Sequence, residues 1–364
     1  MQMITICLLV YVCSGKIHPE QTLQDNNLNI KKVRWGIAGL GNIAHRFVTD
    51  LSVQVENAEL YAVAARDKQR ADSFSNQYGC QTSYGSYLEL ANDSDVDIVY
   101  IATIHPFHKS LVELFLNHGK HVLVEKPAFT NLKDWDAMST LAEEKGLLLA
   151  EAMKTAVFPA YQAMKEFIKE KNVKINSIDA SFGNWHEFDS DWHLFNPKLC
   201  GGATLDVGVY GLWLYVDLCQ LTNTPVPKPI VEYAKDNIQS EVDENVVFTF
   251  DGQIKGKICA SITRALKREA IIRGPDLEII IHNKWWNPKT IDISFKGEQT
   301  QISMFVSGGG FECEIEHISS LILKKNNYSD VLRKETSRQV ISIMEQSLVD
   351  NGFDYLVCST SASS

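Results

Sequence analysis

The residues best suited to carry chemistry are one lysine and an aspartate–tyrosine pair in two separate segments. Lys126 follows the apolar run HVLV, and Asp206 and Tyr210 lie in GGATLDVGVYGL. Residues four apart share one face of a helix, so Asp206 and Tyr210 can face the same partner. The ordinary pKa of tyrosine, about 10, is too high for a good base at neutral pH. A lysine ammonium beside Tyr210 favours its phenolate, which could then accept a proton from an alcohol. By spacing alone, Lys126 and Asp206 could equally be solvated side chains and Tyr210 a packed one.

A glycine turn indicates the cofactor class. GLGNIA follows the apolar run VRWGIA and fits the pattern Gly-x-Gly-x-x-Gly/Ala. Gly39 permits a tight turn, and Gly41 lets a pyrophosphate approach the backbone; Ala44 allows close packing of the following helix. Free amides at that helix start would bind the phosphates. The preceding strand and following helix are the context that this motif requires. We therefore predict dinucleotide binding, with contacts from Gly39, Gly41, Asn42 and Ile43.

The end of the second predicted strand bears on the choice between NADP and NAD. An NAD enzyme usually places a carboxylate there to bind the ribose 2′-hydroxyl. This chain has Arg66 first, then Asp67, and Arg70 beyond. A guanidinium suits a 2′-phosphate, so the arginines favour NADP, while Asp67 keeps NAD possible.

The elements around these motifs change character near residue 153. From 31 to 152, short apolar runs alternate with helical stretches, which predicts a doubly wound parallel sheet of the Rossmann type. From 153 to 348 we expect an α+β substrate domain with an open, mostly antiparallel sheet and helices on one face. Asp251-Gly252 predicts a hairpin in that sheet. Residues 1–30 are expected to be an extension and 349–364 a tail. Lys126 would then lie at the carboxyl edge of the parallel sheet, where such sheets bind ligands.

Composition narrows the class of protein. A chain of 364 residues suggests two domains, and a net charge of −10 argues against a nucleic-acid surface. No segment approaches the length of a membrane span, and the scattered cysteines are typical of a reducing compartment. We expect a cytoplasmic protein, although an apolar stretch at 4–13 would imply secretion if residues 1–15 were a signal peptide. No cluster of metal ligands is evident, so no metal is expected.

GLGNIA, EKP and GGATLDVGVY, in this order, resemble the Gfo/Idh/MocA oxidoreductase family, especially its dihydrodiol dehydrogenase and NADP-dependent D-xylose dehydrogenase branch. The likeness runs from about Val33 to Glu345. It implies hydride transfer between a nicotinamide and a carbinol carbon of a diol or aldose. Tyr210 would transfer the proton, assisted by Lys126 and Asp206. The resemblance also implies a cis Lys126–Pro127 bond, a homodimer formed through the open sheet, and further cofactor contacts from Thr103, His105, His108 and Glu125.

One segment departs from that branch. Dihydrodiol dehydrogenases tend to carry a tryptophan and an arginine after the EA of the last Rossmann strand, where this chain has Met153, Lys154 and Thr155. The natural diol or sugar is therefore left open. We expect the substrate pocket to include Lys154, Trp192 and Phe195, although the aromatic loop that carries the last two could equally be a structural cluster. Other possibilities are a reductase of another carbonyl compound and an inactive dinucleotide-binding sensor or scaffold protein. A sensor would not need Lys126, Asp206 and Tyr210 together.

Overall fold

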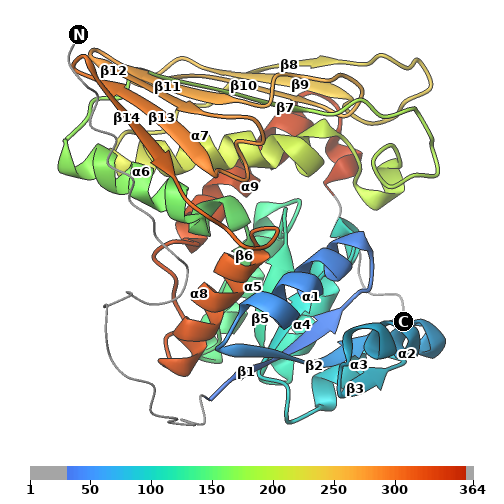
Figure 1. Ribbon diagram of the computed structural model, residues 1–364. Helices are drawn as coiled ribbons and strands as arrows, with labels where there is room; N and C mark the ends of the chain where they lie inside the picture. The colour runs from blue at the N-terminus through green and yellow to red at the C-terminus, as the bar shows by residue number, and fades with distance from the viewer. Residues whose placement is uncertain (1–30, 358–364) are drawn as a thin grey trace, which may run out of the picture.

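The computed structural model describes residues 31–357 (Figure 1). The predicted extension at 1–30 lies outside these residues, as does the part of the predicted tail, 349–364, that begins at 358. The described part of that tail completes a helix that ends at Asp350 and forms a 3-10 turn at Asp354–Leu356. The predictions about a signal peptide and about the compartment therefore stay predictions.

The N-terminal half is a six-stranded parallel sheet in the order β3-β2-β1-β4-β5-β6. Its strands are β1 (Val33–Ala38), β2 (Ala58–Ala64), β3 (Thr82–Tyr84), β4 (Ile98–Ile101), β5 (His121–Glu125) and β6 (Leu149–Ala152). Its helices are α1 (Asn42–Gln54), α2 (Lys68–Tyr78), α3 (Tyr87–Asn92), α4 (His108–Asn117) and α5 (Leu132–Glu144). All residues of β4 are buried, as expected of strands covered on both faces. The Rossmann prediction is confirmed.

The C-terminal half contains an eight-stranded sheet in the order β14-β13-β12-β11-β7-β10-β9-β8. Its strands are β7 (Ser177–Gly183), β8 (Ile230–Ala234), β9 (Asn245–Phe250), β10 (Lys255–Ser261), β11 (Ala270–Gly274), β12 (Leu277–Ile281), β13 (Thr290–Phe295) and β14 (Glu298–Ser303). Within this sheet β7 and β10 are parallel, and the other neighbouring strands are antiparallel. The predicted open, mostly antiparallel sheet is confirmed, including the hairpin at Asp251-Gly252 between β9 and β10.

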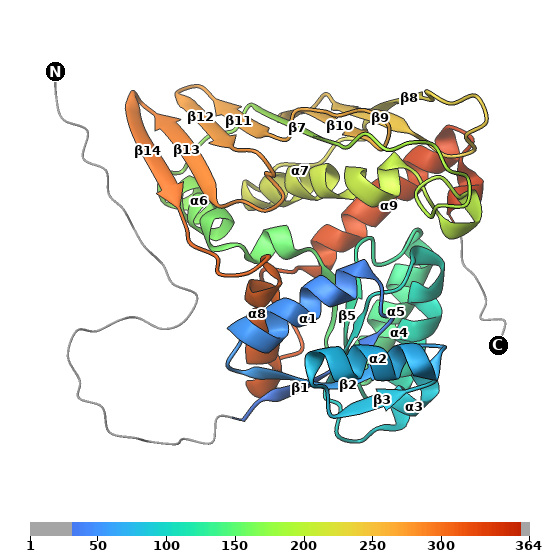
Figure 2. The same cartoon turned by 45° about the vertical axis from the view of Figure 1, so that its right-hand side comes forward.

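Two helices, α6 (Pro159–Glu170) and α7 (Val209–Leu221), lie along one face of this sheet, and the other face is open (Figures 1 and 2). The helical stretch Pro197–Leu221 contains a window that is long and apolar enough for a membrane span, contrary to the sequence prediction. However, 83% of that window is buried inside the protein. The stretch is a core helix between the two halves, and it carries the catalytic candidates at its start.

Two helices return the chain to the Rossmann half. In α8 (Phe311–Leu323), Ser319 Oγ accepts a hydrogen bond from Trp35 Nε1 of β1 at 3.0 Å. In α9 (Lys334–Asp350), Arg338 Nε donates to Asp136 Oδ1 of α5 at 2.7 Å. α8 therefore packs against the Rossmann half although it falls in the range 153–348 predicted for the C-terminal domain, and those domain limits stay a prediction. The apolar periodicity of a helix shows that one face is covered, but it does not show which sheet covers it.

Candidate active site

The glycine turn has the geometry needed for a phosphate site. Gly39 adopts φ +92°, and a Cβ there would lie 2.7 Å from Thr103 Cγ2. Gly41 precedes α1 without a side-chain cap, and no atom lies within 4 Å of the place that its Cβ would take. The first amides of α1 are therefore free to bind an anion, as a dinucleotide pyrophosphate requires.

A cavity of about 850 Å³ extends from this turn along the carboxyl edge of the parallel sheet. Twelve of the predicted site residues line it: Gly39, Gly41, Asn42, Ile43, Arg66, Arg70, Thr103, His105, Glu125, Lys126, Trp192 and Asp206. Thr103 Oγ1 is buried there without a hydrogen-bond partner in the described part of the chain. A buried hydroxyl of this kind needs a partner. A ribose or amide group of a dinucleotide would provide one, so these residues fit such a cofactor.

The two arginines mark one end of the cavity. The Arg66 guanidinium lies 5.4 Å from the centre of the Phe107 ring, and Arg70 Nη2 donates to the Leu40 carbonyl at 2.6 Å. Asp67 caps α2 by accepting a hydrogen bond from the backbone N–H of Gln69 at 2.9 Å. The structural role of Asp67 as a helix cap explains this carboxylate without a hydrogen bond to a ribose hydroxyl.

At the other end of the cavity, Lys126 is joined to Asp206. Lys126 Nζ donates to the backbone oxygen of Asp206 at 2.7 Å and to its Oδ1 at 3.1 Å. Burial disfavours the charge of Lys126, but the carboxylate of Asp206 outweighs burial and holds the lysine pKa above its ordinary value. The same pairing lowers the pKa of Asp206, although partial burial of that carboxyl acts in the opposite direction. Both groups are therefore ionised at neutral pH. The Lys126–Pro127 bond is cis, as the resemblance implied.

Tyr210 lies beside this ion pair, with its ring centre 5.1 Å from Lys126 Nζ. Asp206 belongs to a π-helical turn, Thr204–Gly208, which precedes α7 and brings both residues to Lys126. Burial raises the pKa of Tyr210 to about 12. Lys126 offsets only part of this rise, and the negative charges of Glu125 and Asp206 add to it. Lys126 favours the phenolate, as expected, but burial outweighs its effect. Tyr210 is a phenol and can donate a proton.

The two histidines after β4 have different surroundings. His105 Nδ1 faces the Cys200 carbonyl at 3.1 Å, so it carries the proton, and Nε2 is left as an acceptor at the cavity. Burial lowers the pKa of His105 to about 3, with His108 and Lys126 adding to the effect. His108 is fully buried, and its nitrogens face the carbonyls of Thr103, Pro127 and Ala128. His108 does not line the cavity, and its ring holds two backbone segments together; its contact with the cofactor stays a prediction.

Two predicted substrate residues, Lys154 and Phe195, do not line the cavity, and Tyr210 lies behind its lining beside Lys126. Lys154 is buried; its ammonium donates to the Gly309 carbonyl at 3.2 Å and lies 4.4 Å from the centre of the Phe311 ring. Phe195 is only 1% exposed and packs against Phe188. Trp192 does line the cavity. Phe195 therefore belongs to the structural aromatic cluster that was the alternative interpretation.

Sequence reasoning missed several residues that line the cavity, including Arg46, Tyr87 and Phe107, and did not rank His193 among the site residues. Arg46 follows Asn42 by one turn of α1, so helical spacing from the glycine motif could have identified it. His193 lies in the aromatic loop from which substrate contacts were expected, next to Trp192. Tyr87 belongs to a segment that only the tertiary fold brings to the cavity, and no sequence signal identifies it.

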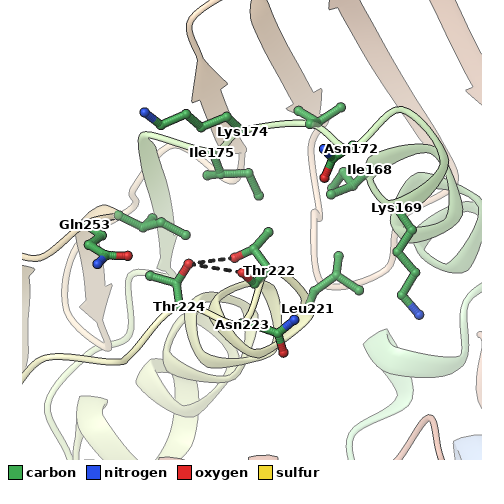
Figure 3. Close-up of a pocket in the computed structure, with 12 residues that line it drawn as sticks. Ile168, Lys169, Asn172, Lys174, Ile175, Leu221, Thr222, Asn223, Thr224 and Gln253 are labelled. Carbon is green, nitrogen blue, oxygen red and sulfur yellow. Dashed lines mark hydrogen bonds between the residues drawn. The ribbon is translucent and has the colours of Figure 1, made fainter.

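A second cavity, of about 430 Å³, lies at the C-terminal ends of α6 and α7 (Figure 3). Thr222 Oγ1 and Thr224 Oγ1 are hydrogen bonded at its rim, at 3.0 Å. None of the predicted site residues lines it. Between residues 31 and 357, no three His, Cys, Asp or Glu side chains are grouped so that they could hold a metal ion. The first cavity is therefore the candidate active site.

Comparison with known proteins agrees with this geometry. Residues 33–153 match the model of the GFO_IDH_MocA oxidoreductase family, which has an NAD-binding Rossmann fold. The chain is 29% identical over 333 residues to the trans-1,2-dihydrobenzene-1,2-diol dehydrogenase of Xenopus tropicalis, covering 88% of this chain and 99% of that protein. It is 31% identical over 333 residues to the Mus musculus enzyme of the same name, covering 86% and 95% of the two chains.

Solved structures show the same fold. The aldose-aldose oxidoreductase of Caulobacter crescentus superposes with a TM-score of 0.76 at 19% identity, over 88% of this chain and 98% of that one. KijD10, a 3-ketoreductase of Actinomadura kijaniata solved with NADP and TDP-benzene, gives 0.74 at 22% identity with the same coverage. The Rossmann half, the lysine at its carboxyl edge, the open eight-stranded sheet and the extent of these matches lead to one conclusion. The chain belongs to the Gfo/Idh/MocA oxidoreductase family and is an NAD(P)-binding oxidoreductase related to dihydrodiol and sugar dehydrogenases.

Proposed function

We propose that this protein transfers a hydride between NADP and a carbinol carbon of a trans-dihydrodiol or of an aldose such as D-xylose. The observation that carries the proposal is the bond from Lys126 Nζ to Asp206 Oδ1 at 3.1 Å, at one end of a dinucleotide-sized cavity. The opposite end carries Arg66 and Arg70, two cations that suit a 2′-phosphate. NAD is the alternative cofactor.

The residues of this chain supply binding and proton transfer. When bound, the nicotinamide gives or takes the hydride at the carbon atom. Lys126 would donate a hydrogen bond to the substrate oxygen, and Asp206 holds the ammonium in place. In reduction, Tyr210 would give its phenolic proton to the oxygen as the carbonyl π electrons become an O–H bond. In oxidation, the same proton would return to the Tyr210 phenolate while the C–H bond breaks with its electron pair.

An aromatic side chain at the cavity supports a substrate with a ring. Trp192 lines the cavity at the end that carries Lys126 and Asp206. Flat aromatic side chains commonly pack on the faces of sugars and cyclic diols. The dihydrodiol and aldose enzymes among the relatives support the same class.

A second candidate is a reductase of another carbonyl compound. Tyr210 is protonated in the cofactor-free protein, which suits the reductive direction. KijD10, one of the similar structures, is a 3-ketoreductase. A homodimer formed through the open face of the eight-stranded sheet is compatible with either reaction, and we propose it as the assembly.

A spectrophotometric screen of the purified full chain tests the proposal. With NADP⁺ supplied, the absorbance of NADPH should rise when a trans-dihydrodiol or D-xylose is added. With NADPH supplied, it should fall when the corresponding ketone is added. Reduction of ketones without oxidation of any diol or aldose would favour the second candidate. Tight binding of NADPH with no turnover in either direction would instead identify a sensor or scaffold protein.

A further inference from the structure

Glu314, on α8, is a fully buried carboxyl group with no visible use in the fold. Both of its carboxyl oxygens are inaccessible to solvent, and neither has a hydrogen-bond partner among residues 31–357. An ionised carboxylate in such surroundings is strongly disfavoured. Buried polar groups left without partners call for an explanation, and one explanation is a functional role.

Glu314 interacts electrostatically with a second carboxyl group and with an ammonium, and we call their common buried surroundings the pocket. Glu125 accepts hydrogen bonds from the Tyr100 hydroxyl and, at 3.2 Å, from the backbone N–H of Lys126. Lys154 contributes the nearby positive charge. Since Glu125 receives two hydrogen bonds and Glu314 none, the negative charge resides on Glu125 and the proton on Glu314. Burial and the charge of Glu125 accordingly raise the pKa of Glu314 well above its usual value.

Other ionisable groups face this pocket from several elements. Besides Glu125 and Lys154 they are Arg46 and Asp50 of α1, Tyr100 of β4, Glu151 of β6 and Tyr210 of α7. Burial, with Arg46 nearby, lowers the pKa of Lys154 to about 8. Lys154 could therefore also exchange a proton near neutral pH.

The pocket adjoins the place that the nicotinamide ring would take. The phosphate turn at Gly41 lies between the Arg66 end of the cavity and the Lys126 end, so the adenosine and nicotinamide halves would extend in these two directions. Glu125 lines the cavity at the nicotinamide end. The oxidised nicotinamide ring carries a positive charge and the reduced ring does not. A new cation beside Glu125 would favour ionisation of the neighbouring carboxyl group.

We propose that Glu314 releases its proton when the oxidised cofactor binds and keeps it when the reduced cofactor binds. The inference rests on the proposed function, because it takes NADP(H) as the occupant of the cavity. On binding of NADP⁺, the carboxyl O–H bond breaks, the proton passes to solvent, and the carboxylate stays beside Lys154. The affinity for NADP⁺ relative to NADPH must then rise with pH, since the two equilibria are linked.

Proton release measured with an indicator dye in weak buffer tests this directly. The full chain is saturated with NADP⁺ or with NADPH between about pH 6.5 and 9. The 2′-phosphate, whose pKa is near 6, is common to both cofactors, so the difference between them isolates the effect of the ring. Wild-type protein should release a larger fraction of a proton on binding NADP⁺ than on binding NADPH. Its ratio of Kd for NADP⁺ to Kd for NADPH should fall about threefold or more across this range.

Glu314→Gln keeps the shape of the side chain and removes the proton, so it should abolish the difference between the two cofactors. Glu316→Gln makes the same change on the same helix, where the side chain is only half-buried, and it should behave like wild type. An undiminished difference in Glu314→Gln would overturn the proposal while leaving the proposed function intact. If neither NADP⁺ nor NADPH binds, the proposal for Glu314 and the proposed function both fail.

A second variant distinguishes Glu314 from Lys154 as the source of the proton and does not depend on the folding of Glu314→Gln. Lys154 favours the ionised form of Glu314. Lys154→Met should therefore move the release to higher pH without removing it. Complete loss of the release in Lys154→Met would assign the proton to the lysine and overturn the proposal for Glu314.

Discussion

The carboxylate of Asp243 accepts a hydrogen bond from the backbone N–H of Thr204 at 2.7 Å, although 39 residues separate them. This bond caps the π-helical turn that carries Asp206 and leads into Tyr210. Gly202 has φ +111°, and a Cβ at that position would collide with Asp243 Oδ1. Gly202 thus makes room for a buried cap from another segment, and this cap positions the catalytic candidates.

Two substitutions of Asp243 distinguish its hydrogen bond to Thr204 from the charge of its carboxyl group. Asp243→Asn keeps an acceptor for Thr204 N–H, whereas Asp243→Ala loses it and should cost about 1 kcal/mol of stability or more. We also expect Asp243→Ala to lower kcat more than it raises KM for NADP, because the displaced turn carries Asp206 and not the phosphate site. Steady-state kinetics and urea unfolding measure both effects. Equal kcat in Asp243→Ala and Asp243→Asn would contradict the positioning role.

The charge of Asp243 makes a prediction about pH. Burial raises its pKa to about 7, so the folded protein holds this proton more tightly than the unfolded chain, where the pKa is about 3.9. The stabilisation of the folded state by this proton is fully present below about pH 4 and is lost as the pH rises to about 7. Asp243→Asn removes this loss, so its stability relative to wild type should grow across that interval, by on the order of 2–4 kcal/mol. Unfolding curves at several pH values test it, and a constant difference would refute it.

Lys126→Met should abolish most of the activity. The substitution removes the donor to the substrate oxygen and leaves the half-buried Asp206 carboxylate without its cation. We expect kcat to fall by about 100-fold or more, since such groups commonly contribute factors of 10² to 10³. Fluorescence titration should show cofactor binding changed much less. Lys109→Met, at a surface ion pair on α4, is the matched control and should leave kcat unchanged.

The order of the elements and the glycine turn could be predicted because both depend on local sequence patterns. Apolar runs such as IVYI in β4 indicate buried strands, whereas β14 has mostly exposed polar residues and β3 only three half-buried ones, so neither has a recognisable pattern. The state of Tyr210 could not be predicted, because its pKa depends on burial by distant segments. The same holds for His108, whose carbonyl partners come from two loops.

Tyr210 should make the two reaction directions respond differently to pH. Since its pKa is about 12, the phenol predominates at neutral pH, and the phenolate fraction rises tenfold with each pH unit below that value. Oxidation needs the phenolate, so its kcat/KM should rise with pH over the alkaline range, while reduction should stay nearly flat. Tyr210→Phe should lower both by about 100-fold or more and remove the slope, whereas Tyr328→Phe at an exposed position should change neither. A slope that persists in Tyr210→Phe would assign the proton transfer to another group.

Arg66→Ala should discriminate between the two cofactors. The guanidinium is exposed at one end of the cavity, above Phe107, where a 2′-phosphate would meet it. Hydrogen bonds to charged groups contribute about 1.5–3 kcal/mol, so KM for NADP should rise about tenfold to a hundredfold. KM for NAD should change less than about threefold, because NAD has no 2′-phosphate and Asp67 remains engaged as the cap of α2. Arg338→Ala, a surface arginine paired with Asp136, controls for the loss of one positive charge. An equal rise of both KM values would show that Arg66 binds a part common to NAD and NADP, and the preference for NADP would then have no support from this residue.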